Sequence, residues 1–255
     1  YRLWLDGRKE ELLSLGDPDG NTYDRQHRLI DCASVLRAMI AITPDGHYKV
    51  LADKFEGKRL NSPNDIVYRS DGSLYFTDPP YGLPKQDEDP NKDLPFNGVY
   101  RFANGKLQLL VDTMTRPNGL AFSPDEKTLY VNDTNGIQSF AFDVLSDGRL
   151  SNRRVFATYA GRTPPLGATD GVASGADDLV IDNDGRVYAI TAAGIEVFTE
   201  AGKPLGIIPV TCSPTGARCQ ALAFGGQDKR ILYVAGNGTL LRLQMVAQGF
   251  MGRAK

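Results

Sequence analysis

Histidine, cysteine and tryptophan are scarce in this chain of 255 residues, which contains two, three and one of them respectively. The spacing of Cys32, Cys212 and Cys219 matches neither a zinc-binding pattern nor a disulfide framework. A bridge between Cys212 and Cys219 across a loop is possible, but we favour the interpretation that all three are buried or free thiols. Because His27 and His47 lie in predicted turns, we assign neither to catalysis.

Other absences exclude whole classes of protein. The net charge is −2 and no block of Lys or Arg interleaves with aromatic residues, so nucleic acid is not an expected partner. No apolar run approaches the roughly 18 residues that a membrane-spanning helix needs. We therefore expect a soluble protein. The compartment stays open between cytoplasm, periplasm and secretion, because a signal peptide before residue 1 would not be visible.

The chain does contain an internal repeat. An apolar residue, an Asp or Gly turn and a strand that usually carries Tyr recur in five copies: 23–32, 68–78, 122–133, 181–191 and 224–236. With Ile30, Tyr75, Tyr130, Tyr188 and Tyr233 as equivalents, the steps are 45, 55, 58 and 45 residues. Repetition of β-rich units at this period is typical of a β-propeller.

A second kind of segment alternates with these copies and predicts an outer hairpin for each blade. It occurs six times, at 1–15, 38–53, 98–112, 136–157, 194–208 and 238–249. Six outer hairpins and five inner ones predict an all-β, six-bladed propeller that forms a single domain over residues 1–255. The inner half of the first blade is then expected to be rebuilt, or to lie before Tyr1. No stretch with helical periodicity competes with this prediction.

Asn or Asp recurs at one position of the repeat. Asn64 precedes Tyr75 by 11 residues, and the matching residues in the other copies are Asn118, Asp177 and Asp19, with Ala221 in the fifth copy. In a propeller the innermost strands line a central channel, so we expect these side chains to converge. Carboxylate and amide oxygens are suitable ligands for Ca²⁺, Mg²⁺ or Mn²⁺. The alternative is that these residues only cap turns, which is the role we predict for Asp71, Asp125 and Asp184.

Three blocks carry a resemblance to a known family: "RLNSPNDIVYRSDGSLYFTDPPYG", "RPNGLAFSPDEKTLYVND" and "LAFGGQDKRILYVAGNGTLLRL". They resemble the SMP-30/gluconolactonase family of six-bladed lactonases, and the bacterial gluconolactonase branch most. The resemblance implies one divalent cation in the channel, Ca²⁺ first, with Mg²⁺, Mn²⁺ and Zn²⁺ as alternatives. The family's metal ligands map onto Asn118 and Asp177, and its metal-contacting or substrate-contacting Asn maps onto Asn64.

The chain departs from the family pattern at three places. The family's N-terminal metal-binding Glu has no counterpart after Tyr1. Asp19 stands where close relatives usually carry Asn, and we expect it to approach the metal and restore the lost negative charge. Ala33 and Ser34 replace residues of a stretch that contributes to the pocket in relatives.

The resemblance implies metal-assisted hydrolysis of a small-molecule lactone or ester. We expect Asn64 to hydrogen-bond the substrate or its developing oxyanion, and Asp177 or Asp133 to take a proton from water. Tyr81 is expected at the pocket rim. The absence of a G-x-S-x-G motif argues against a covalent nucleophile. A phosphotriester or aryl-ester hydrolase on the same site, and a non-catalytic metal-binding scaffold, stay open as alternatives, as does the oligomeric state.

Overall fold

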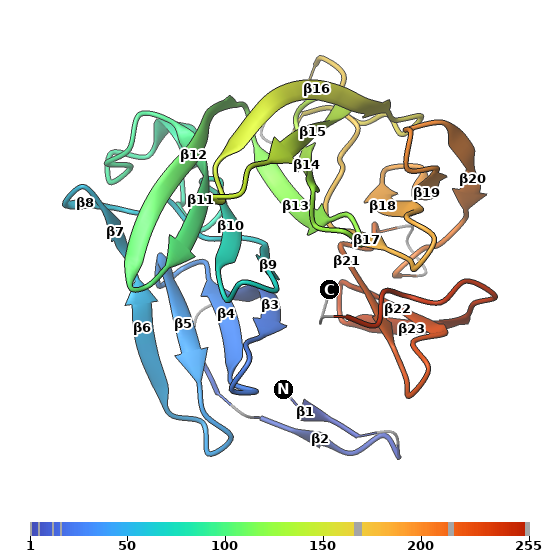
Figure 1. Cartoon of the computed structure of the whole chain (residues 1–255), viewed down its shortest axis with the longest axis horizontal. Helices are drawn as coiled ribbons and strands as arrows, with labels where there is room; N and C mark the ends of the chain where they lie inside the picture. The colour runs from blue at the N-terminus through green and yellow to red at the C-terminus, as the bar shows by residue number, and fades with distance from the viewer. Residues whose placement is uncertain are drawn as a thin grey trace.

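The computed structural model of the chain describes residues 2–4, 6–11, 13–15, 17–165, 170–213 and 217–252. Five antiparallel sheets of consecutive strands are arranged around a central axis (Figure 1). Four of these blades have four strands, and the last has three. The prediction of an all-β propeller is confirmed. The prediction of six blades was wrong for the described residues, which form five.

Each blade is a continuous stretch of chain. The first comprises β3 (Pro18–Tyr23), β4 (Leu29–Ala33), β5 (Ala38–Ile42) and β6 (Tyr48–Ala52). The second comprises β9 (Ile66–Tyr68), β10 (Leu74–Asp78), β11 (Asn97–Ala103) and β12 (Lys106–Met114). The third comprises β13 (Pro117–Phe122), β14 (Thr128–Asp133), β15 (Gln138–Val144) and β16 (Leu150–Thr158). The fourth comprises β17 (Leu179–Ile181), β18 (Val187–Thr191), β19 (Gly194–Phe198) and β20 (Pro204–Ile208). The fifth comprises β21 (Ala221–Gly225), β22 (Ile231–Gly236) and β23 (Thr239–Gln244).

Two small hairpins and one helical turn lie outside the blades. β1 (Arg2–Leu3) pairs with β2 (Lys9–Glu10), below the gap between the first and last blades in Figure 1. This hairpin lies where the sequence predicts an outer hairpin, and no inner pair accompanies it among the described residues. β7 (Lys54–Phe55) pairs with β8 (Lys58–Arg59), and η1 (Gln86–Glu88) is a 3₁₀ turn. In the described part of the chain, no helix is long and apolar enough to cross a membrane.

The segment after β23 does not complete the outer hairpin predicted over 238–249. Instead it crosses to the fourth blade, where Asn183 N donates to Gln248 O (2.8 Å) and Phe250 N donates to Ile181 O (3.3 Å). The backbone at Gly249 packs so closely on Phe224 that a Cβ there would lie 2.2 Å from the Phe224 Cβ. Glycine at this position therefore allows the crossing.

The core consists of apolar layers between adjacent blades, because alternate strand residues point to opposite faces of each sheet. In β10, Phe76 packs towards the first blade in a cluster with Ile30 and Ile66. Its neighbour Tyr75 packs towards the third blade, where its ring meets Phe122 edge-on with centroids 4.9 Å apart. Tyr130 and Tyr188, which mark the third and fourth copies, likewise pack in clusters with residues of the next blade.

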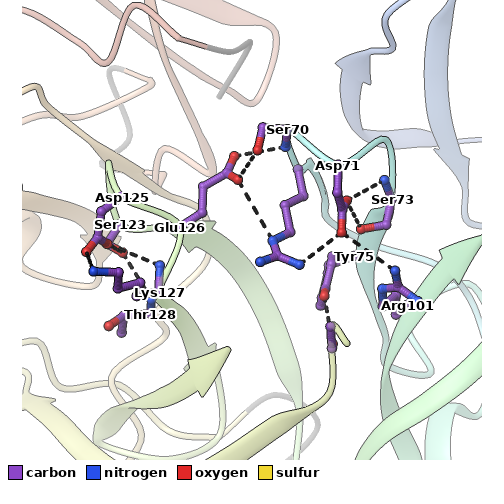
Figure 2. Close-up of polar contacts among 12 residues, drawn as sticks. Ser70, Asp71, Ser73, Tyr75, Arg101, Ser123, Asp125, Glu126, Lys127 and Thr128 are labelled. Carbon is purple, nitrogen blue, oxygen red and sulfur yellow. Dashed lines mark hydrogen bonds and ion pairs between the residues drawn. The ribbon is translucent and has the colours of Figure 1, made fainter. Parts of the chain in front are cut away.

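Polar side chains stabilise the turns between the two inner strands (Figure 2). Asp71 Oδ1 accepts hydrogen bonds from the backbone N and the hydroxyl of Ser73, and Asp125 Oδ1 accepts them from Lys127 N and the Ser123 hydroxyl. The structural role predicted for Asp71 and Asp125 is therefore confirmed.

Side chains also join neighbouring turns to one another, and the residue that accepts the turn N–H groups differs between blades. Glu126 accepts hydrogen bonds from the backbone N and the hydroxyl of Ser70, which joins the turn of the third blade to that of the second (Figure 2). In the fourth blade, Asp182 rather than Asp184 accepts the turn N–H groups, so the prediction for Asp184 was wrong. Asp182 stands at the first residue of that turn, where its side chain reaches both N–H groups.

Adjacent innermost strands are linked by single hydrogen bonds along the channel. Gly20 N donates to Asn64 O (2.6 Å) and Gly119 N donates to Asp177 O (3.1 Å). Two carboxylates make further links: Asp65 accepts from Ile66 N of its own strand and Leu120 N of the next blade. Asp178 bonds in the same way to Leu179 N and Leu222 N.

Glycine and aspartate alternate at this linking position. Gly20, Asp65, Gly119 and Asp178 are equivalent in the strand registers, as Thr22, Val67, Ala121 and Val180 each lie two residues later and pair with equivalent residues of the next strand. A Cβ at Gly20 would lie 2.5 Å from Asp65 Oδ1, and one at Gly119 would lie 2.4 Å from Asp177 O. The first and third blades therefore need glycine at this position, because the neighbouring blade approaches so closely, whereas the fifth blade has Ala221 there.

The last residues of β10 and β14 are buried carboxylates that fix the loops leading to the channel. Asp133 accepts hydrogen bonds from Thr115 N and Arg116 N, both at 3.0 Å. Asp78 Oδ2 accepts one from Asn61 N (2.8 Å), whereas Asp78 Oδ1 is buried with no hydrogen-bond partner among the described residues. Burial raises the pKa of Asp78 to about 7.

We predict that Gly119→Ala destabilises the protein by about 1–3 kcal/mol, because the new Cβ overlaps the Asp177 carbonyl. Gly136→Ala is the matched control, since its Cβ would meet Asp133 atoms at an ordinary 3.6 Å. That variant should change the free energy of unfolding by less than about 0.5 kcal/mol. Urea unfolding of both variants measures the difference, and equal stabilities would contradict the close approach.

We predict that Asp78 makes folding less favourable as the pH rises. Its pKa is about 7 in the folded protein against 3.8 ordinarily, so between about pH 4 and 7 the unfolded chain loses a proton that the folded protein keeps. Stability then falls with rising pH, by at most about 1.4 kcal/mol per pH unit from this group. Asp78→Asn should flatten the decline when unfolding is measured at pH 5, 6 and 7 (about one-unit steps across this window). Parallel curves for parent and variant would show that Asp78 is ionised when folded.

Candidate functional site

The predicted ring of polar residues forms at the inner strands. Asn64 N donates to Thr77 O (2.9 Å) and Asp177 N donates to Ile190 O (3.0 Å), two residues after the Tyr that marks each repeat. The same bond in the fifth blade runs from Gln220 N to Ala235 O (2.8 Å). The fifth equivalent is therefore Gln220, and its assignment to Ala221 was wrong by one residue. The hairpin turn of the fifth blade is longer, so counting back from Tyr233 misplaced it.

These side chains line one cavity of about 1090 Å³. Asp19, Asn64, Asn118, Asp177 and Gln220 all contribute to its wall. Tyr81, Gln86, Thr134 and Arg218 line it as well, and of these only Tyr81 was predicted. Asp133 does not line the cavity, and both of its oxygens are occupied by backbone N–H groups.

The orientations of the two asparagine amides are set by their neighbours. Asn64 Nδ2 donates to Asp19 Oδ2 at 2.6 Å, and a carboxylate can only accept. Thr134 gives its single hydroxyl hydrogen to Ala176 O (2.7 Å), so it accepts from Asn118 Nδ2 at 2.9 Å. Both amides therefore face these neighbours with nitrogen, and no described residue donates to their side-chain oxygens. Two oxygens are left for a ligand in the cavity.

Asp177 lies in a strongly perturbed electrostatic environment. Burial raises the pKa of its carboxyl to about 7, and the negative charge of Asp178 adds to the rise. Arg218 and the amide of Asn118 act in the opposite direction. A carboxylate whose ionised form is disfavoured by burial and a like charge gains most from a nearby cation.

Tyr81 presents a neutral phenol to the cavity. Burial raises the pKa of Tyr81 well above its usual value, and the charge of Asp177 adds to the rise. Its hydroxyl is buried with no hydrogen-bond partner among the described residues. At neutral pH Tyr81 is thus a neutral phenol that can donate a hydrogen bond, buried beside the cavity and close to the Thr134 side chain.

A disulfide lies next to the wall residues Arg218 and Gln220 in the sequence. Cys212 and Cys219 are bonded, so the prediction of three thiols was wrong, and Cys32 alone is free and buried. The sequence spacing allowed this bridge without favouring it. Cys212 N donates to Ala217 O (3.0 Å), and the Cα atoms of the two cysteines lie 5.0 Å apart.

The donor set of the cavity suits a hard divalent cation. No group of three or more His, Cys, Asp and Glu occurs among the described residues, so a zinc-type cluster is absent from them. Two oriented amide oxygens and the Asp177 carboxylate, with Asp19 beside Asn64, instead provide a mixed oxygen set. Such oxygens are the ligands of Ca²⁺ and Mg²⁺ in proteins.

Comparison with known proteins gives consistent matches. The model of the SMP-30/Gluconolactonase/LRE-like region matches residues 1–237. The chain is 32% identical over 215 residues to a gluconolactonase from Zymomonas mobilis, which covers 83% of this chain and 58% of that protein. It is 26% identical over 198 residues to the diisopropyl-fluorophosphatase of Loligo vulgaris, covering 74% and 60%. It therefore spans less than two thirds of either relative.

A solved structure agrees with these matches. The fold superposes on that of a gluconolactonase from Xanthomonas campestris with a TM-score of 0.76 and 35% identity, over 92% of this chain and 74% of the other. The family model covers most of the blades, and the blocks around Asn64 and Asn118 lie within it. The chain belongs to the SMP-30/gluconolactonase/LRE-like family.

Proposed function

We propose that this chain hydrolyses a sugar lactone with the help of one divalent cation, for which Ca²⁺ is the first candidate. The observation that carries the proposal is the convergence of Asn64, Asn118 and Asp177 on one cavity, with both amide oxygens left unoccupied. The gluconolactonases among its relatives support the choice of lactone over other esters.

The cation would be bound by Asn118 and Asp177, with Asn64 and Asp19 completing the set. When bound, it would polarise the ester carbonyl and lower the pKa of a water molecule. Two negative charges, from Asp19 and Asp177, would balance the charge of a divalent ion. The amides add oxygens without adding repulsion.

The chain's own residues then supply binding and proton transfer. Asp177 takes a proton from water as the water oxygen attacks the lactone carbonyl carbon. The bond from that carbon to the ring oxygen breaks, and the proton passes to the ring oxygen to give the hydroxy acid. Tyr81 donates a hydrogen bond to the substrate, and Asn64 contacts it through its side chain. Asp133 was a second candidate base, but its oxygens both accept backbone N–H groups, so we do not propose it.

The second candidate function is hydrolysis of phosphotriesters or aryl esters at the same site. The similarity to the diisopropyl-fluorophosphatase favours it, because a P=O group is polarised in the same way as C=O. A binding scaffold without activity is the third. Rates with glucono-δ-lactone, phenyl acetate and paraoxon, each with and without millimolar Ca²⁺, separate the three functions.

We predict that Asp177→Asn lowers lactone turnover by a factor of about 10² or more, because it removes the base and a charged ligand at constant volume. Asp184→Asn is the control, since that carboxylate pairs with Arg186 in a surface turn. Circular dichroism checks that both variants are folded. Full activity of folded Asp177→Asn would rule out our assignment.

We predict that Asp19→Asn weakens Ca²⁺ binding roughly tenfold, because it removes one of two carboxylates near the ion. Asn64→Ala should instead lower kcat more than Ca²⁺ affinity, since Asn64 also contacts the substrate while Asn118 and Asp177 remain to bind the ion. Calorimetric titration of the parent and both variants with Ca²⁺ alone measures the affinities. If Asp19→Asn binds Ca²⁺ as the parent does, Asp19 serves only to orient Asn64.

A further inference from the structure

The loop between β10 and β11 contributes Gln86 to the cavity wall. Gln86 begins the short turn η1 and has a φ of +50°, a left-handed conformation that non-glycine residues rarely adopt. Such a conformation costs about 1–3 kcal/mol and persists only where the surroundings impose it.

Arg116 is the residue that holds the Gln86 side chain in place. This residue is only 6% exposed and lies two residues before Asn118. One guanidinium nitrogen donates to Gln86 Oε1, and another contacts Asp87 Oδ2 at 2.7 Å. The guanidinium carbon also lies 5.6 Å from the centroid of the Tyr81 ring. Arg116 thus positions Gln86, Asp87 and Tyr81 relative to the ring of inner strands.

The contact with Arg116 determines which end of the Gln86 amide is left over. A guanidinium only donates, so the atom that faces it is the amide oxygen. The Gln86 amide nitrogen has no hydrogen-bond acceptor among the residues that the structure describes. The asparagines show the reverse arrangement, with nitrogen engaged and oxygen left. The cavity therefore combines oxygens on the inner strands with a donor on the loop.

We propose that Gln86 binds a hydroxyl group of the substrate and makes the site selective for polyhydroxylated lactones, with Arg116 as its positioning residue. A lactone hydroxyl accepts from the amide nitrogen, whereas an unsubstituted ring leaves that donor without a partner. This inference rests on the proposed function, because it specifies the substrate class of the same site. The Gln86 amide and a sugar hydroxyl are both uncharged, so the hydrogen bond between them forms without either group gaining or losing a proton.

The test compares glucono-δ-lactone with δ-valerolactone. Gln86→Met keeps the length of the side chain and removes the amide. We expect the ratio of kcat/KM for the two lactones to fall roughly tenfold, as the loss of one hydrogen bond predicts. Glu88→Gln, in the same turn but outside the cavity, is the matched control and should keep the parent's ratio. An unchanged ratio in folded Gln86→Met overturns the inference.

Arg116→Lys tests the positioning role separately. Lysine keeps the charge but cannot bind Gln86 and Asp87 through a rigid fork. The ratio should fall in this variant as well, with KM for glucono-δ-lactone rising more than kcat changes. A fall in kcat alone, equal for both lactones, would show a merely structural role and contradict the proposal.

The affinity for a lactam tests the role of Gln86 without requiring that the protein hydrolyse a lactone. D-Glucono-δ-lactam has an amide in place of the ester, and amides resist hydrolysis far more than esters do, so its affinity relative to δ-valerolactam can be measured by calorimetry. We expect the parent to prefer the hydroxylated lactam and Gln86→Met to lose about tenfold of that preference. If the parent hydrolyses neither lactone, the proposed function fails, while the lactam preference still supports or overturns the role of Gln86.

Discussion

The innermost strands of adjacent blades have no ladder between them, and they contact one another through single hydrogen bonds. Gly119 N bonds to Asp177 O, and the carboxylates of Asp65 and Asp178 each join two blades. The site residues lie immediately before these links in sequence. The distance between Asn118 and Asp177 therefore depends on a backbone contact between two blades. Alternation of glycine with aspartate at the linking position follows from the same need for close approach.

The chemistry of the cavity depends on which end of each amide faces it. Side-chain amides are ambiguous by themselves, because oxygen and nitrogen are nearly equal in size. Here a carboxylate, a threonine whose hydrogen is already used, and a guanidinium each remove that ambiguity. The neighbours of the site residues thus divide the wall into accepting and donating parts. A cation and a hydroxylated ring need different parts of it.

The repeat pattern was enough to predict the propeller and four of its converging residues, because equivalent strands impose equivalent positions. It misplaced Gln220, since a longer turn changed the count from Tyr233 by one residue. It could not predict Gln86, because the long loop between β10 and β11 has no counterpart in the other blades. It could not predict the Cys212–Cys219 bond either, because that bond depends on how close the two cysteines lie in the folded chain. The number of blades was overestimated because residues 1–15 resemble the outer half of a blade, whereas β1 and β2 form a separate hairpin with no inner pair among the described residues. The residues after β23 resemble the second half of an outer hairpin but cross to the fourth blade, which leaves the fifth blade with three strands.

In the described part of the chain, every blade is built from one uninterrupted stretch, and no sheet combines strands from distant parts of the chain. All strand pairs within the blades are therefore local in sequence, although the five blades together surround the central axis. Local pairing is associated with fast folding, because short loops lose little entropy when they close. Each blade can form as a meander during synthesis, before its neighbours exist. The cavity residues then meet only in the last step, when the separate sheets assemble around the axis.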